Sequence, residues 1–249
     1  MKVIESLPEL QAVRHSINLK VGFVPTMGAL HEGHISLMHL AQSNADLVFA
    51  SIFVNPTQFG PNEDFNKYPR TLNEDIEKLQ GFADYIYVPR VEDIYPAGYT
   101  TTIHVEEESK GLDGDFRPGH FDGVATVVNI LFNQVRPDIA VFGEKDWQQL
   151  MVIKRMVKDL DLEIEIIGAP ILRESDGLAM SSRNRYLSPE ERAVAPKIYE
   201  LMTKLKDAEK VKAELTRLGF EVDYVEKRWN RLLTAARIGT TRLIDNIPV

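Results

Sequence analysis

The chain has 249 residues, of which 44% are hydrophobic and 27% charged, so disordered, collagen-like and coiled-coil chains are excluded. It contains no cysteine, which excludes disulfide scaffolds, cysteine–zinc sites and thiol catalysis. Its formal net charge of −8 disfavours a general polyanion binder but leaves room for a small phosphate ligand held by a few local groups.

The beginning of the chain carries acidic residues and a proline, and therefore lacks the apolar run of a signal peptide. No stretch of about 18 apolar residues occurs, so no membrane-spanning helix is expected. From these two features we expect a cytoplasmic protein.

Short β-rich runs alternate with helical patterns over the first two-thirds of the chain. Two of these runs, Leu47–Val54 and Ile139–Phe142, are apolar apart from Ser51 and do not alternate, which is typical of strands buried on both faces of a parallel sheet. The predicted strands are Val21–Thr26, Leu47–Val54, Tyr85–Val88, Ile139–Phe142 and Ile164–Ile167.

Helical patterns lie between these strands. Hydrophobic residues recur at helical spacing from Val124 to Val135 and again from Leu150 to Leu160. The segment 71–74 is a capping-box pattern that predicts the start of a third helix. This alternation predicts an α/β fold, with a Rossmann-like doubly wound parallel sheet over residues 1–172.

The pattern changes after residue 172. A polar loop over residues 173–186 leads to Ser188, where proline and glutamate at the first and third positions complete a helix start. Helical segments should continue to about Leu218. We expect residues 173–249 to form a small α+β lid domain that ends with two β-like runs, Phe220–Val225 and Thr241–Ile247.

The segment 21–38 carries the clearest chemical signal, because a buried strand runs into a glycine-containing turn that opens a helix. Ligands of open α/β sheets bind at the carboxyl ends of strands, and a helix N-terminus offers N–H groups to phosphate. Gly28 and Gly33 allow close approach, while His31 and His34 can face one side and hold phosphate oxygens. Helix capping or metal ligation is the alternative for this pair.

Four further polar residues or segments are candidates for the site. Lys145 lies at the end of an apolar strand, where a cation can neutralise an α-phosphate. Gln58 follows an Asn-Pro turn former and suits a hydroxy acid that carries a carboxylate. The hydroxyls and guanidinium of 181–183 suit phosphate, with a solvated linker as the alternative. Asp75 could help to hold magnesium, or could be a solvated acid favoured by the helix dipole.

The string from Pro25 to His34, Pro-Thr-Met-Gly-Ala-Leu-His-Glu-Gly-His, resembles the pantothenate synthetase (pantoate–β-alanine ligase) family of the His-x-Gly-His nucleotidyltransferase superfamily. The resemblance extends over nearly the whole chain. It implies ATP-dependent condensation of (R)-pantoate with β-alanine to pantothenate through a pantoyl adenylate, with release of AMP and pyrophosphate. It also implies ATP and Mg²⁺, a homodimer, and no nucleic-acid or membrane partner.

The same resemblance implies residue roles. His31, His34 and Lys145 would be catalytic, with His34 also a proton donor, and Gln58 and Gln149 would hold pantoate, Gln58 near the β-alanine site. The loop 180–186 would clamp the triphosphate. The implied ATP-binding residues are Met27, Gly28, Ala29, Leu30, His31, Glu32, Gly33, His34, Gly143, Glu144, Lys145, Asp146, Leu172, Met180, Ser181, Ser182 and Arg183.

One segment departs from the family pattern. Between Glu226 and Arg231 the chain has only Lys227–Asn230, where family members usually carry a longer connection. We therefore expect the hairpin or loop at this place to be shortened or lost.

Three other functions stay open. An adenylyltransferase with a phosphorylated acceptor would use the same histidines, but its acceptor pocket should need an additional Arg or Lys, whereas Gln58 and Gln149 are neutral. A nucleotide-sensing module would bind ATP without turnover. A metal hydrolase would hold stoichiometric zinc.

Overall fold

In the computed structural model, which describes residues 1–60 and 65–249, six parallel strands form one sheet in the order β1-β4-β3-β2-β5-β6. From β2 the chain winds outward through β3 and β4, then returns to place β5 and β6 on the other side of β2. The sheet is thus doubly wound, with its switch point between β2 and β5, which confirms the predicted fold. Its strands are β1 (Lys2–Ile4), β2 (Val21–Thr26), β3 (Leu47–Ile52), β4 (Tyr85–Tyr87), β5 (Ile139–Gly143) and β6 (Glu165–Ala169).

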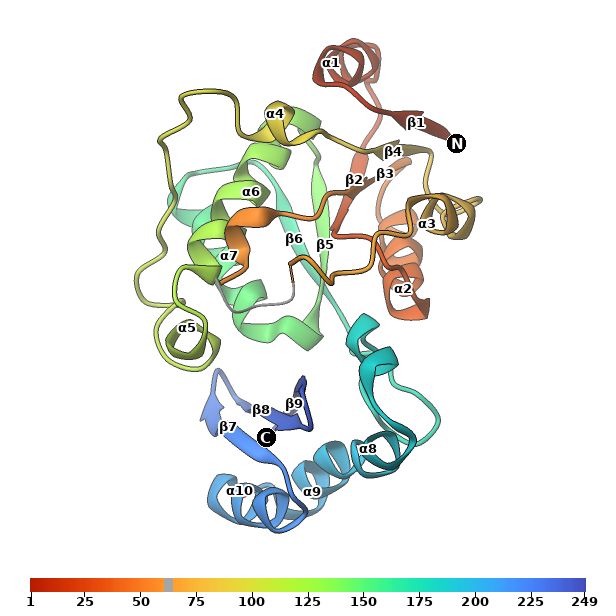
Figure 1. Ribbon diagram of the computed structural model, residues 1–249. Coiled ribbons are helices and arrows are strands. Elements are labelled where there is room, and N and C mark those ends of the chain that lie inside the picture. Colours follow the sequence, from red (N-terminus) through yellow and green to blue (C-terminus); the bar gives the residue numbers. More distant parts are fainter. Residues whose placement is uncertain (61–64) are drawn as a thin grey trace.

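Helices cover both faces of this sheet (Figure 1). Alternate strand residues such as Phe23 and Phe49 pack with α1, α6 and α7, whereas Val24 and Ala50 pack with α2 and α3, because successive strand residues point to opposite faces. The helices of this part are α1 (Leu7–His15), α2 (Glu32–Gln42), α3 (Leu72–Lys78), α4 (Val91–Ile94), α5 (Asp113–Phe116), α6 (His120–Val135) and α7 (Trp147–Asp159), with the 3₁₀ turns η1 (Pro56–Gln58) and η2 (Glu144–Asp146).

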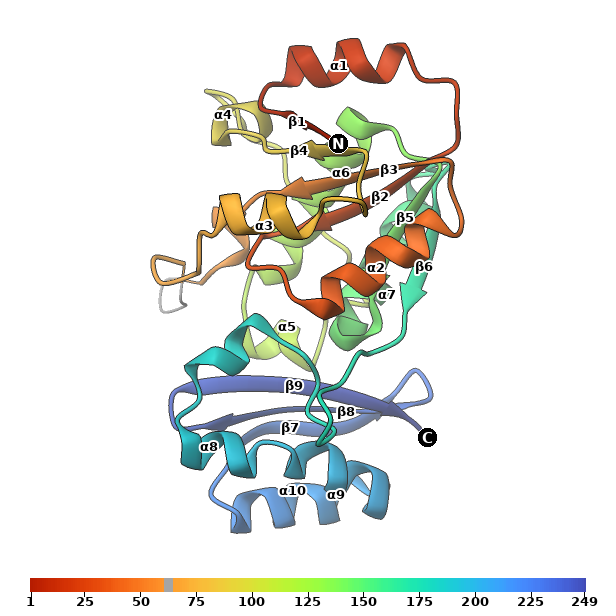
Figure 2. The ribbon, with the colours of Figure 1, turned by 90° about the vertical axis from the view of Figure 1, so that its right-hand side faces the viewer.

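The remainder of the chain forms a small domain around a three-stranded antiparallel sheet with its own core. This sheet lies between the large domain and the helices α8 to α10 (Figure 2). The predicted division after residue 172 lies in the connection that follows β6 and stays a prediction. The elements are η3 (Ser182–Tyr186), α8 (Pro189–Val194), α9 (Lys197–Leu205), α10 (Ala208–Arg217), β7 (Glu221–Arg228), β8 (Arg231–Ile238) and β9 (Thr241–Pro248).

The two predicted helix starts, at Ser188 and Thr71, differ in their capping. Ser188 caps α8 as predicted, since its Oγ accepts a hydrogen bond from the Glu191 N–H. Thr71, the predicted cap of α3, makes no capping bond, because its hydroxyl donates to Asp75 Oδ2 instead. The sequence patterns also missed β1 and β8.

The shortened connection at Lys227–Asn230 forms a tight hairpin. Strands β7 and β8 stay paired as far as Arg228 and Arg231, and Trp229 and Asn230 alone make the turn, with φ of 51° and 56°. A two-residue turn with both residues at positive φ matches the twist of an antiparallel pair. The hairpin is therefore shortened but not lost.

Candidate active site

A cavity of about 240 Å³ opens at the switch point of the large sheet, where the carboxyl ends of β2 and β5 diverge. Side chains from the ends of four strands, from α2 and α6 and from the loop before η3 line it. The sequence-predicted residues that line this cavity are Met27, His31, Gly33, His34, Gln58, Gly143, Lys145, Asp146, Gln149, Leu172, Met180, Ser181, Ser182 and Arg183.

The turn between β2 and α2 is held from behind by a buried carboxylate. Asp75, fully buried at the start of α3, accepts hydrogen bonds from the N–H groups of Ala29 (2.9 Å) and Leu30 (2.7 Å). Gly28 has φ +78°, and a Cβ there would lie 2.9 Å from Asp75 Oδ2. The carboxylate thus fixes the turn and is not among the residues that line the cavity.

His31 and His34 form a reciprocal cap at the start of α2. The Nδ1 of His31 accepts from the Gly33 N–H at 3.1 Å, and the Nδ1 of His34 accepts from the His31 N–H at 3.3 Å. A Cβ on Gly33 would lie 2.8 Å from the His31 ring, so only glycine leaves room for this arrangement. Helix capping, one of the two alternatives to a ligand-binding role, is therefore realised while both histidines also line the cavity.

Both imidazoles are neutral at pH 7. Burial lowers the pKa of His31 to about 4, and the positive charge of Lys145 lowers it further. Burial also lowers the pKa of His34 to about 3, with smaller contributions from His31 and Lys145. The pair consequently offers neutral N–H donors, and His34 does not carry the additional proton that the expected proton donor would need.

Lys145 lies in η2, directly after β5. Its side chain is 21% exposed, and its Nζ lies 3.9 Å from Asp146 Oδ2. It lines the cavity at the switch point and also a second, larger cavity of about 770 Å³ between the two domains. Lys145 is thus shared by the two cavities, together with Asp146, Ser181 and Arg183.

Another part of the inner-cavity lining combines an amide with an apolar wall. Gln58 is 8% exposed, and its Oε1 accepts from Asn55 Nδ2 at 3.0 Å. Asn55 is in turn held by the Tyr95 hydroxyl, which donates to its Oδ1 at 2.8 Å. The wall is contributed by α6 through Val124, Val127, Val128 and Leu131.

The predicted phosphate-binding residues Ser181, Ser182 and Arg183 form the start of η3, and local hydrogen bonds hold this loop in place. Ser181 accepts through Oγ from the Arg183 N–H at 3.3 Å, and Met180 N–H donates to the Leu172 carbonyl at 3.0 Å. The loop therefore closes one side of the cavity.

Six predicted site residues do not line the inner cavity. Ala29 and Leu30 are buried with their N–H groups directed to Asp75, Gly28 turns the chain behind them, and Glu32 is exposed. The carboxylate of Glu144 pairs with Arg231 instead. Asp75 is the sixth.

Sequence reasoning missed two residues that shape the pocket. Asn55 is interpreted above only as a turn former, although it is a polar side chain three positions from Gln58, and that proximity is the signal that could have found it. The Nδ1 of His120 lies 2.9 Å from the Gln58 carbonyl oxygen, and no local signal announces this contact, because the two residues are 62 positions apart.

A doubly wound sheet with imidazole, ammonium and hydroxyl groups at its switch point defines a protein of the nucleotide-binding α/β class. The sequence profile of the family described as pantoate-beta-alanine ligase matches residues 2–248. The chain belongs to this family.

Relatives and solved structures agree with this membership. The chain is 53% identical to the pantothenate synthetase of Rhodospirillum rubrum, over 100% of this chain and 99% of that protein. That alignment spans 280 positions, more than the 249 residues here, so this chain has gaps relative to it. A pantothenate synthetase from Thermus thermophilus superposes with a TM-score of 0.92 at 41% identity, covering 100% and 99% of the two chains.

A pantoate-beta-alanine ligase from Francisella tularensis, complexed with beta-gamma ATP and beta-alanine, superposes with a TM-score of 0.94 at 41% identity, covering 100% of this chain and 97% of that one.

Among the described residues, 1–60 and 65–249, no helix has both the length and the apolar character needed to cross a bilayer.

Proposed function

We propose that the chain condenses (R)-pantoate with β-alanine to pantothenate at the expense of ATP, through a pantoyl adenylate, and releases AMP and pyrophosphate. The observation that carries this proposal is the inner cavity, whose lining brings the Gln58 amide and the α6 wall together with the histidine pair and Lys145. The amide and the apolar wall suit a small acid with an apolar body, and the imidazoles and the ammonium group suit phosphate.

The first step is the attack of a pantoate carboxylate oxygen on the α-phosphorus of ATP, which breaks the bond to the pyrophosphate leaving group. The chain contributes positioning and charge neutralisation rather than a nucleophile. Gln58 and Gln149 hold the acid, and the apolar groups of pantoate contact Val127 and Val128. Lys145 and the imidazole N–H groups stabilise the negative charge that develops on the phosphates.

The second step is the attack of the β-alanine amine on the acyl carbon of the adenylate, with AMP as the leaving group. A free carboxylate reacts poorly with an amine, and adenylation supplies a good leaving group.

Ser181, Ser182 and Arg183 would hold the triphosphate in the first step from the side of the small domain.

Magnesium enters this proposal as part of the Mg–ATP substrate. Among the described residues no three His, Asp or Glu side chains gather in a group that could hold a metal ion. Asp75 does not fit the expected ligand role, since its two oxygens accept hydrogen bonds from Ala29, Leu30 and Thr71. We assign no step to a protein-bound magnesium ion.

The adenylyltransferase alternative needs a basic acceptor pocket. The described residues that line the inner cavity include only Lys145 and Arg183 as permanent cations, and both lie on the phosphate side. This favours a carboxylic acid over a phosphorylated acceptor.

Pyrophosphate–ATP isotope exchange with Mg²⁺ and without β-alanine tests the proposal. Exchange that depends on pantoate is the expected result, and β-alanine should then yield AMP and an amide. A folded protein that binds ATP but shows no exchange with pantoate would contradict the proposal. That result would favour a nucleotide-sensing module or an enzyme with another acceptor.

We also propose a cytoplasmic homodimer. Support comes from the family resemblance for the dimer and from the ATP requirement for the location. Light scattering coupled to gel filtration distinguishes a dimer from the 28.3 kDa monomer.

A further inference from the structure

The turn that carries Lys145 is held by the small domain. Asn246 in β9 is 2% exposed, and its Nδ2 donates to the backbone carbonyls of Glu144 at 2.9 Å and Lys145 at 3.1 Å. No side chain caps the start of η2. The amide of Asn246 therefore reaches across the domain boundary to the backbone of the lysine that the proposed function places on the phosphates.

Arg231 in β8 fixes the direction of this amide. One guanidinium nitrogen donates to Asn246 Oδ1 at 2.7 Å, so that the NH₂ group of Asn246 faces the two carbonyls. Another nitrogen pairs with Glu144 Oε2 at 2.5 Å, and the guanidinium lies 3.8 Å from the centroid of the Trp147 ring. Arg231 thus contacts Glu144 and Trp147, which flank Lys145 in the chain. It also contacts Asn246, whose amide donates to the Lys145 backbone.

We propose that Asn246 and Arg231 are positioning residues that set Lys145 at the junction of the two cavities, and that docking of the small domain thereby completes the phosphate site. The inference rests on the proposed function. Neither residue lines either cavity, so each acts through Lys145 rather than on a ligand. Since charge stabilisation falls with distance and depends on direction, a lysine on an unanchored turn loses much of its effect.

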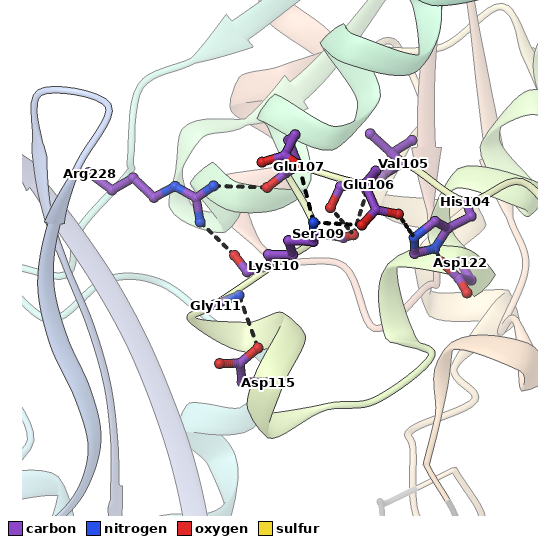
Figure 3. A network of polar contacts seen from close by, with 10 residues as sticks. All are labelled: His104, Val105, Glu106, Glu107, Ser109, Lys110, Gly111, Asp115, Asp122 and Arg228. Atoms are coloured by element: carbon purple, nitrogen blue, oxygen red, sulfur yellow. Dashed lines mark hydrogen bonds and ion pairs between the residues drawn. The ribbon is translucent and has the colours of Figure 1, made fainter.

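The same hairpin provides a matched control. Arg228 of β7 also reaches the large domain and donates to two backbone carbonyls, those of Lys110 at 2.5 Å and Glu107 at 2.9 Å (Figure 3). The residues it contacts line neither cavity. Arg228→Ala therefore removes an interdomain contact of similar type without touching the turn that carries Lys145.

The experiment compares Asn246→Ala with Arg228→Ala, each alone and combined with Lys145→Ala. Pantoate-dependent pyrophosphate–ATP exchange and calorimetric binding of ATP are measured. We expect Asn246→Ala to slow exchange by about 100-fold and to weaken ATP binding, with the KM for pantoate unchanged. Arg228→Ala should stay within about twofold of the parent, as expected for a distant and independent site.

The double variants separate positioning from general destabilisation. If Asn246 acts through Lys145, Asn246→Ala costs nothing further once Lys145 is alanine. Equal losses in Asn246→Ala and Arg228→Ala, or an undiminished loss in the Lys145→Ala background, would overturn the inference. Thermal unfolding of each variant is measured alongside.

Arg231→Lys provides a second variant if Asn246→Ala does not fold. Lysine keeps the positive charge beside Glu144 but lacks the planar guanidinium that donates to Glu144 and Asn246 at the same time. We therefore expect an intermediate loss of exchange. Exchange equal to that of the parent would contradict the role of Arg231. If the parent protein shows no pantoate-dependent exchange, the proposed function fails, whereas the ATP-binding comparison of the same variants still decides the role of Asn246.

Discussion

The imidazole rings of His31 and His34 face each other across the first turn of α2, with centroids 4.2 Å apart and planes inclined by 49°. Each Nδ1 accepts a hydrogen bond from a backbone N–H, so the proton of each neutral ring lies on Nε2. Two neutral donors this close to Lys145 add hydrogen bonds for phosphate without adding charge repulsion. This relationship determines how the site should respond to substitution and to pH.

Replacement of His34 or Lys145 by alanine should slow adenylation strongly while the fold stays intact. We expect pantoate-dependent exchange to fall by roughly 100-fold to 1,000-fold in each variant, because each removes a donor aimed at developing charge. Lys154→Ala, an exposed lysine on α7, is the matched control and should keep full activity. Near-normal adenylate formation in both site variants would refute the assignment.

The histidines should titrate at widely separated pH values. In NMR spectra of histidine-labelled protein, the His31 and His34 ring signals should stay constant from pH 8 to about 5.5, because burial lowers both pKa values, to about 4 and about 3. His104 should titrate above its ordinary value, since its hydrogen bond to Asp122 raises its pKa. A midpoint near 6.5 for His34 would contradict the neutral pair.

The same pKa shifts predict how the stability of the protein changes with pH. Between the folded values near 4 and 3 and the unfolded value near 6.5, the unfolded state binds more protons, so the free energy of unfolding should fall as pH drops through this window. The contribution of His104 has the opposite sign: it is present below 6.5 and lost as pH rises through the raised folded pKa.

Asp75→Asn should destabilise the protein in a manner that magnesium cannot reverse. The substitution places an NH₂ group against buried backbone N–H groups, and we expect a loss of about 3 kcal/mol in the free energy of unfolding. Urea unfolding at low and high Mg²⁺ measures it, with the exposed neighbour Glu74→Gln as control. Restoration of activity by added Mg²⁺, with stability unchanged, would support the metal-ligand role instead.

The two-residue turn of the β7–β8 hairpin should discriminate between side chains. Asn230 has φ 56°, which a β-branched residue adopts at high cost, so Asn230→Val should lower the free energy of unfolding by about 1–2 kcal/mol. Asn230→Gly should stay close to the parent. Equal stability of the valine variant, by urea unfolding, would show that the hairpin tolerates another connection.

Local patterns were sufficient for five of the six strands of the large sheet, β2 to β6, and for most of the predicted residues near its switch point. Runs such as Ile139–Phe142 are apolar because both faces of the sheet are covered, and this property can be seen without a structure. The edge strand β1 has three residues, too few for a pattern. Strand β8 is buried over most of its length, so it shows no alternation, and the departure from the family pattern at Lys227–Asn230 left its pairing with β7 open.

The site residues also differ in how far their roles could be predicted from the sequence. Residues that follow a strand or open a helix, such as Lys145 and His34, were identified from their position in the chain. The role of Asp75 depends on hydrogen bonds to residues 45 and 46 positions away, and that of Asn246 on contacts 101 and 102 positions away. Contacts of this separation leave no local signature, because the intervening chain decides whether they form.

The contact between Asn246 and the Lys145 carbonyl joins parts of the chain that are 101 residues apart, and it has a kinetic consequence. The contact cannot form until β9 is in place, because Asn246 belongs to this strand. A refolding intermediate with only the large sheet formed would lack the part of the cavity lining that Met180 to Arg183 contribute, and its Lys145 would be unanchored. Catalytic activity should therefore return with the three-stranded sheet rather than with the bulk of the helix signal, and the time course of refolding would order the two events.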